Sequence, residues 1–161
     1  MENLKIRAIT LDDHGWIVKF LEEKWGSPRI VSRGKIHQAD ELPGFIAEQE
    51  QNQIGLVTYN IAGDQCEIVT LNSLAEGVGI GTELIKRVIQ EAVSHQCVRV
   101  WLVATNDNTN ALRFYQTRGF HLAALYKNEV EKSRKLKPEI PSWGLDSIPI
   151  RDEIELEMIL K

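Results

Sequence analysis

Three glycines alternate in the segment Gly77-Val78-Gly79-Ile80-Gly81, which follows a segment of strand periodicity and precedes one of helix periodicity. Glycine adopts positive φ without strain and lets the backbone come close to a ligand. The first turn of a helix leaves backbone N–H groups without partners, and together with the helix dipole they attract an anion. The segment therefore predicts a phosphate-binding turn, with a tight strand-to-helix turn that binds nothing as the alternative.

The spacing of the glycines narrows the class of phosphate ligand. A dinucleotide-binding turn has the pattern GxGxxG and an acidic residue about twenty residues further on, within an early βαβ unit. A nucleoside-triphosphate loop has the pattern GxxxxGK followed by Ser or Thr. The sequence has GxGxG and no lysine after Gly81, so both ligand classes fit poorly.

The elements that position this turn are predicted from the period of the apolar residues. Alternation predicts strands at 4–10, 44–48, 54–61, 66–72, 98–104, 120–126 and 150–160. A period near 3.6, with capping residues, predicts helices at 12–25, 80–92 and 110–118, and a charged, weaker one at 129–136. We expect residues 29–43 to form an irregular surface segment and 137–149 an ordered loop.

The order of these elements predicts the fold class. The second, third and fourth strands are separated by short polar turns, so they form an antiparallel meander. Strands and helices then alternate, which predicts a mixed sheet with helices on its faces. The chain has 161 residues, and we expect residues 1–161 to form a single domain.

Two segments carry a resemblance to a known family. Residues 74–85, around the glycine turn, resemble the coenzyme A signature of the GNAT N-acetyltransferases. Residues 108–120 have the form N-x-x-A-x-x-x-Y-x-x-x-G-F and resemble that family's second signature. The resemblance covers residues 4–126 with core signatures within 66–126, and the ending Lys137-Pro138-Glu139-Ile140-Pro141 is similar to that of bacterial members.

The resemblance implies a single-domain GNAT-like α/β (α+β) fold. Its central sheet would be mixed and mostly antiparallel, with about seven strands, splayed between strands 4 and 5, and with helices on both faces. It also implies a variable acceptor segment at 26–43 and an inserted loop at 129–149 before the last strand.

The implied activity is an acyl-CoA-dependent N-acetyltransferase with acetyl-CoA as cosubstrate and no metal. The acetyl group would move to a primary amine of a small acceptor, by direct attack in a ternary complex. Glu76 stands where the family has Arg or Gln, and it cannot donate to the pyrophosphate. A non-catalytic acyl-CoA-binding or interaction domain on the same fold is therefore the alternative.

The resemblance also assigns the catalytic roles. Tyr115 would be the general acid for the coenzyme A thiolate, since its phenol carries its proton at neutral pH. The backbone N–H of Leu71 would donate to the thioester carbonyl, and Glu67 would be the base. The alternatives are a core tyrosine for Tyr115 and a paired surface glutamate for Glu67, with water accepting the proton.

The expected binding residues fall into two groups. Those for the cofactor are Leu71, Asn72, Ser73, Gly77, Val78, Gly79, Ile80, Gly81, Thr82, Asn106, Asn108, Ala111 and Tyr115. For Asn108 a simple helix N-cap is the alternative. Those for the acceptor are Trp25, Arg29, Arg33, His37 and Trp143, each of which also has a structural or solvated alternative.

Composition excludes other partners. A net charge of −4 and an isoelectric point of about 5.6 disfavour nucleic acid and anionic membranes. The chain shows no signal-peptide pattern and no long apolar run, so we expect a cytoplasmic protein. Cys66 and Cys97 form no CxxC pair and no metal-ligand cluster, which predicts two free thiols. A homodimer is left open.

Overall fold

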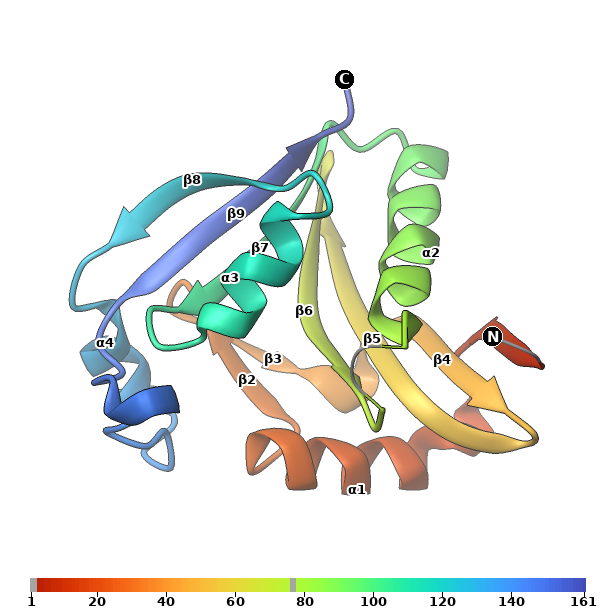
Figure 1. Cartoon of the computed structure of the whole chain (residues 1–161), viewed down its shortest axis with the longest axis horizontal. Helices are drawn as coiled ribbons and strands as arrows, with labels where there is room; N and C mark the ends of the chain where they lie inside the picture. Colours follow the sequence, from red (N-terminus) through yellow and green to blue (C-terminus); the bar gives the residue numbers. More distant parts are fainter. Residues whose placement is uncertain (1–2, 76–77) are drawn as a thin grey trace.

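The computed structural model describes residues 3–75 and 78–161 (Figure 1). The elements are β1 (Leu4–Ala8), α1 (His14–Trp25), β2 (Arg29–Ser32), β3 (Lys35–Gln38), β4 (Gly44–Gln49), β5 (Asn52–Ala62), β6 (Gln65–Ser73), α2 (Ile80–Ser94), β7 (Arg99–Thr105), α3 (Thr109–Gln116), β8 (His121–Tyr126), α4 (Glu129–Leu136) and β9 (Glu153–Ile159). Short 3-10 turns lie at Leu11–Asp13, Ala39–Glu41 and Leu145–Ser147. The predicted helices and main strands all form, with shifts of a few residues at their ends.

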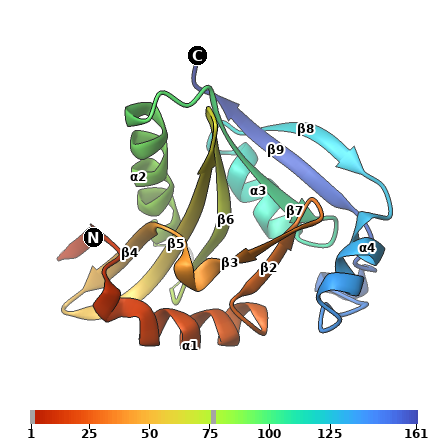
Figure 2. The same cartoon turned by 180° about the vertical axis from the view of Figure 1, so that it is seen from behind.

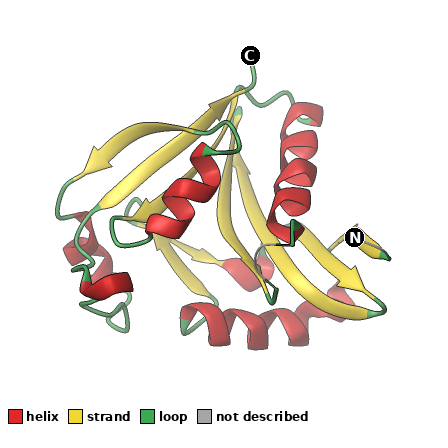
Figure 3. Ribbon diagram, in the orientation of Figure 1, coloured by secondary structure: helices red, strands yellow, loops and turns green. Residues whose placement is uncertain are grey.

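Seven strands form one central sheet in the order β1-β4-β5-β6-β7-β9-β8. Figure 3 shows the helices packed around these strands. Its neighbouring strands are antiparallel except β6 and β7, which are parallel. The mixed, mostly antiparallel α+β sheet predicted from the sequence is therefore confirmed.

The sheet opens between its fourth and fifth strands in chain order, β6 and β7. These strands pair only where residues 65–67 of β6 face residues 99–101 of β7. Beyond that point β6 continues to Ser73 and β7 to Thr105, and the two strands diverge (Figure 1). The predicted splay is present, and it leaves an edge of each strand without a strand partner.

Helices cover both faces of the sheet, so each buried strand contributes to two apolar cores. Phe45 and Val57 belong to the core under α2 and α3, whereas Ile46 and Leu56 belong to the core under α1. This alternation follows from the two-residue period of a strand. Figure 1 shows α2 and α3 on the near face, and Figure 2 shows α1 and the β2–β3 hairpin on the other.

Residues 29–43 correct one expectation, because they are not irregular. They form the two-stranded hairpin β2–β3 and a 3-10 turn. Arg33 and Gly34 make its two-residue loop with φ of 51° and 76°, as a type I′ turn requires. Each strand has only four residues and carries charged side chains, so the alternation was too short to predict it.

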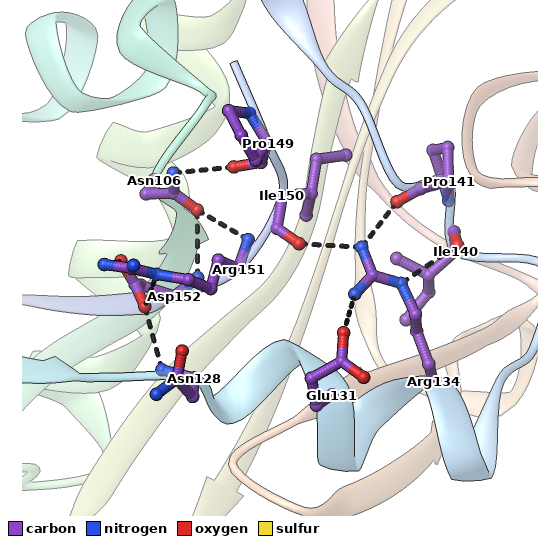
Figure 4. A network of polar contacts seen from close by, with 10 residues as sticks. All are labelled: Asn106, Asn128, Glu131, Arg134, Ile140, Pro141, Pro149, Ile150, Arg151 and Asp152. Carbon is purple, nitrogen blue, oxygen red and sulfur yellow. Dashed lines mark hydrogen bonds and ion pairs between the residues drawn. The ribbon is translucent and has the colours of Figure 1, made fainter.

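The loop before the last strand is ordered, as expected. Arg134 on α4 donates to the backbone carbonyls of Pro141 and Ile150 over 2.8 and 2.7 Å, and it pairs with Glu131 (Figure 4). The ammonium of Lys137 donates to the carbonyl of residue 25 over 2.9 Å. These contacts fix α4 and the loop to the end of α1 and to the entry of β9.

The helices of the described segments are all too short or too polar to cross a membrane.

Candidate active site

A cleft of about 850 Å³ follows the splay through the molecule. It starts at the first turn of α2, passes between the diverging ends of β6 and β7, and reaches the β2–β3 hairpin. Its lining residues are Lys24, Trp25, Ile30, Val31, Ser32, Glu67, Ile68, Val69, Leu71, Asn72, Ser73, Ala75, Gly79, Ile80, Gly81, Thr82, Leu102, Val103, Ala104, Thr105, Asn108, Asn110, Ala111, Phe114, Tyr115, Arg118 and Glu153. Both sequence signatures therefore contribute to one cavity.

The glycine turn forms one end of the cleft. Gly79 precedes α2 with φ of 85°, a conformation that a side chain would strain. A Cβ on Gly81 would lie 3.0 Å from Cζ of Phe114, so a larger residue would require the Phe114 ring to shift. The N–H groups of the first turn have no partner within the helix and are available to an anion. Glu76 and Gly77 lie outside the described residues.

Arg118 lies beside this turn. Its Nε donates to Oγ1 of Thr82 over 2.8 Å, and its Nη1 donates to the carbonyl of Phe114 over 3.0 Å. The guanidinium carbon lies 3.7 Å from the centroid of the Phe114 ring. The sequence prediction missed this residue, although it stands within the second signature, because its proximity to α2 arises only from the packing of α3.

The backbone of β6 faces the middle of the cleft. A bulge at Val69 shifts its register with β5 by one residue, which increases the local twist. Beyond the bulge the N–H of Leu74 donates to the carbonyl of Ile54 over 2.8 Å. Since amides alternate along an antiparallel strand, the N–H groups of Leu71 and Ser73 point away from β5 and into the splay.

Asn72 and Trp25 join β6 to the end of α1. The indole Nε1 of Trp25 donates to Oδ1 of Asn72 over 2.6 Å, and both residues line the cleft. The Ser73 hydroxyl donates to the Ala75 carbonyl over 3.3 Å. The predicted cofactor residues of β6 and one predicted acceptor residue are thus brought together.

Tyr115, on α3, is buried and lines the cleft. Its ring packs edge-on against Phe114 and Phe120, with centroids 5.2 and 5.3 Å away. Within the described part of the chain its hydroxyl has no hydrogen-bond partner, so it is not the tethered core tyrosine of the alternative interpretation. Burial raises the pKa of the phenol, which holds its proton at neutral pH.

Asn108 caps α3 and also lines the cleft. Its side-chain Oδ1 accepts from the N–H of Ala111 over 3.1 Å, as expected of an N-cap. Ala111 lines the same wall. The N-cap role is therefore present, and it leaves the amide nitrogen of Asn108 available to the cleft.

Glu67 is a buried carboxylate at the far end of the cleft. The hydroxyl of Ser32, on the hairpin, donates to Glu67 Oε2 over 2.7 Å. Nε2 of His37 lies 3.3 Å from Glu67 Oε1 but makes no hydrogen bond in the described residues. Glu67 is therefore not the exposed, paired glutamate of the alternative interpretation.

A second buried carboxylate, Glu153, lines the same end. It accepts from the hydroxyl of Ser133 over 3.0 Å and from the backbone N–H of Arg33 over 3.2 Å. Burial raises the pKa of this carboxyl. The neighbouring hairpin residues Ser32 and Arg33 therefore hold Glu67 on β6 and Glu153 on β9, across the splay. The sequence prediction missed Glu153.

Several expected site residues do not line the cleft. Asn106 is among them, since its Oδ1 accepts from the N–H groups of Arg151 and Asp152 over 2.9 Å and its Nδ2 donates to the Pro149 carbonyl (Figure 4). Its amide fixes the entry of β9 and is not directed to a cofactor. Val78, largely exposed, also lies outside the lining.

Four of the five expected acceptor residues do not line the cleft. Arg29 donates to the Leu136 carbonyl over 2.7 Å, and the Arg33 guanidinium lies over the ring of Tyr126. Nε2 of His37 lies near the carboxylate of Glu67, and Trp143 lies on an exposed loop. Trp25 is the one that lines the cleft.

No cluster of three or more His, Cys, Asp or Glu side chains suited to a metal ion occurs among residues 3–75 and 78–161. Cys66 and Cys97 are both free and buried.

Comparison with known proteins gives a family match. Residues 10–120 match the model of the Acetyltransferase (GNAT) family, which is more than half of the chain. The uncharacterized protein YdhI of Bacillus subtilis (strain 168) is 44% identical over 145 residues, which cover 89% of this chain and 91% of the relative.

Two solved structures have the same fold. A GNAT family acetyltransferase from Elizabethkingia anophelis with acetyl-CoA bound aligns with a TM-score of 0.71 at 22% identity, over 99% of this chain and 100% of that one. A Bacillus subtilis acetyltransferase in complex with CoA aligns with a TM-score of 0.70 at 16% identity, over 98% of this chain and 99% of that one. At these identities the similarity establishes the fold.

Proposed function

The chain belongs to the acetyltransferase (GNAT) family, and from that premise we propose that it is an acyl-CoA-dependent N-acetyltransferase. It takes the acetyl group from acetyl-CoA and delivers it to the primary amine of a small acceptor by direct attack in a ternary complex. We place the reaction in the cytoplasm, where the buried free thiols Cys66 and Cys97 suit a reducing compartment.

One observation carries the proposal. A single cleft joins the first turn of α2, the buried carboxylate of Glu67 and the hydroxyl of Tyr115, which has no partner among the described residues. Acetyl transfer needs a site for the phosphates, an acid for the leaving thiolate and an acceptor for the amine proton, in that spatial order.

Acetyl-CoA fits the phosphate end and the β6 edge. The N–H groups of the α2 first turn suit the pyrophosphate, and Gly79, with φ of 85°, forms the turn that presents them. The open edge of β6, with the N–H groups of Leu71 and Ser73, suits the amide groups of the pantetheine arm, which would add to β6 as a short strand does.

The acetyl group then lies between Leu71 and Tyr115. The amine nitrogen attacks the thioester carbon, a C–N bond forms, and negative charge develops on the carbonyl oxygen. The N–H of Leu71 donates to that oxygen and stabilises the transition state. The C–S bond breaks, and the sulfur takes the proton of Tyr115, whose phenol is protonated because burial raises its pKa. The attacking nitrogen loses its second proton as the amide forms, and this proton restores the phenol of Tyr115.

The acceptor amine enters from the hairpin end. Amines are ammonium ions at neutral pH, so one proton must leave before attack. Glu67 accepts this proton, directly or through one water, while Ser32 holds the carboxylate in place. The walls here also include Ile30, Val31 and Leu102, which suit an acceptor with a short apolar stem.

Titration calorimetry and thiol release test the proposal together. We expect saturable binding of acetyl-CoA that is lost in Gly79→Asp, which adds a side chain and a negative charge at φ of 85°. We also expect thiol release with at least one member of a broad panel of primary amines.

Two outcomes contradict the proposal. Absence of acetyl-CoA binding by the intact protein would exclude the cosubstrate. Tight binding without thiol release across the panel would favour the non-catalytic acyl-CoA-binding domain. Unfolding curves of the Gly79→Asp variant are the control for loss of the fold.

A further inference from the structure

A cation stands at the positive end of a helix in the cleft. Arg118 donates from Nε to Oγ1 of Thr82, in the first turn of α2, over 2.8 Å. The N-terminus of a helix carries a partial positive charge of about half an elementary charge. A guanidinium at this place is repelled by the dipole, and a bound anion would remove that repulsion.

The remaining contacts of Arg118 hold its guanidinium in one orientation without neutralising it. Nη1 donates to the Phe114 carbonyl and the Thr117 hydroxyl, each over 3.0 Å, and the planar group stacks on the Phe114 ring. Each of its partners in the described part of the chain is electrically neutral. Nη2 makes no contact there that would occupy its two N–H groups.

A purely structural role explains part of this geometry. Arg118 follows the C-terminus of α3, and a cation that donates to the Phe114 carbonyl caps that helix favourably. The cap does not explain the direction of Nε, which points to a different helix and to the end where a cation is unfavourable. A role other than capping of α3 is therefore needed to explain why Nε points to α2.

The glycine turn itself brings no cation to its ligand. From residue 74 to residue 82 the sequence contains no lysine or arginine, and Glu76 is the only charged residue. Backbone N–H groups alone would then face a doubly charged pyrophosphate. Arg118 lines the cleft beside Gly81 and Thr82, so it is placed to supply the missing charge.

We propose that Arg118 binds the pyrophosphate of acyl-CoA, beside the N–H groups of the first turn of α2. Nη2, which has no hydrogen bond within the described residues, donates to phosphate oxygens, while Nε keeps its hydrogen bond to Thr82 and so holds the planar guanidinium in place. Arg118 is thus a cofactor-binding residue that takes no part in the chemical step. The inference rests on the proposed function, because it assumes that acyl-CoA occupies the cleft.

Calorimetric titration of coenzyme A into two matched variants tests the assignment. Arg118→Ala should raise the Kd for coenzyme A by about 10- to 100-fold, as for loss of a charged hydrogen bond. Arg113→Ala removes the same charge five residues earlier, on α3, at an exposed site outside the cleft, and should change the Kd by less than about twofold. Arg118→Lys keeps the charge without the fork and should fall between them.

A ligand series separates phosphate binding from packing. Coenzyme A, 3′-dephospho-coenzyme A and pantetheine share the pantetheine arm, but the second lacks the 3′-phosphate and the third lacks every phosphate. Arg118→Ala should weaken the first two equally and leave pantetheine unchanged. A merely structural role would weaken all three, because it would distort the turn for any ligand.

The outcomes are distinct from those that test the proposed function. If wild type binds no coenzyme A, the proposed function fails and this inference fails with it. If wild type binds and Arg118→Ala binds equally well, only this inference fails. Equal losses for all three ligands, or a loss confined to the ligand with the 3′-phosphate, would also overturn the assignment to the pyrophosphate.

Discussion

Replacing Tyr115 by phenylalanine separates catalysis from packing, because it removes one oxygen atom and keeps the ring. The edge contacts with Phe114 and Phe120, at 5.2 and 5.3 Å, do not involve the hydroxyl. The hydroxyl has no partner among the described residues, so no hydrogen bond inside the protein is lost. Any effect of Tyr115→Phe on turnover therefore reports on what the phenol does to bound ligands.

Tyr115→Phe should have different effects on kcat and on the free energy of unfolding. Loss of a general acid lowers kcat by about 10²- to 10⁴-fold, which corresponds to roughly 3 to 5 kcal/mol of transition-state free energy. The free energy of unfolding should change by less than about 1 kcal/mol, because the hydroxyl makes no hydrogen bond to the described residues. Its raised pKa also means that ionisation of Tyr115 should produce no alkaline fall in kcat below about pH 10.

The assay is thiol release at saturating acetyl-CoA, together with urea unfolding of the same preparations. Tyr59→Phe is the matched control, since Tyr59 is an equally buried phenol that stacks on Phe45 outside the cleft. It should leave kcat unchanged. A kcat for Tyr115→Phe within about threefold of wild type, or an equal loss in Tyr59→Phe, would refute the role of Tyr115 as the acid.

Three further predictions concern other parts of the structure. Glu67→Gln keeps the size of the group that Ser32 contacts, and it should lower kcat/KM by about 10- to 100-fold without weakening acetyl-CoA binding. Full activity of this variant would mean that water, and not Glu67, accepts the amine proton. Gly81→Ala places a Cβ 3.0 Å from Phe114, so it should lower the free energy of unfolding by about 1 kcal/mol and weaken coenzyme A binding. Gly15→Ala, whose Cβ would have nothing within 4 Å, should do neither. Equal effects of the two variants would contradict the packing argument. Arg7 lowers the pKa of Asp13 from 3.8 to about 2, so the pair stabilises the fold above pH 4 and loses this contribution as the pH falls toward 2. Asp13→Asn should therefore lower the free energy of unfolding, measured with urea at pH 7, by about 2 kcal/mol. A loss of stability that does not depend on pH would contradict this prediction.

The sheet, its splay and the cofactor end of the cleft could be predicted from the sequence. Local patterns carry this information: the glycines set the turn before α2, and the second signature sets α3 and Tyr115. Both signatures are short and continuous, so they need no knowledge of tertiary contacts. For the same reason the family's splay between β6 and β7 could be expected, and the structure confirms it.

The acceptor end could not be predicted, because it depends on contacts between distant segments. Ser32 reaches Glu67 over 35 positions in sequence, and the N–H of Arg33 reaches Glu153 over 120. The hairpin that supplies both contacts has strands too short to show a period. Arg118 was missed likewise, since only the packing of α3 on α2 brings it to Thr82.

Asn106 and Asn108 show a further limit of local patterns. Both precede α3 and both have side chains suited to capping or to a ligand. Asn108 caps the helix within the cleft, whereas Asn106 turns to the chain at residues 149–152 (Figure 4). The choice between them depends on where β9 enters the sheet, which no pattern near α3 contains.

Acetyl transfer itself is tested most directly by quantifying coenzyme A thiol and acetylated amine in one reaction, with wild-type protein, acetyl-CoA and an amine found in the panel. We expect the two products to appear in equal amounts and at equal rates, since one C–N bond forms for each C–S bond that breaks. Thiol release without acetylated amine, equal to the rate without acceptor, would mean that water takes the acetyl group and would contradict the proposed N-acetyltransferase.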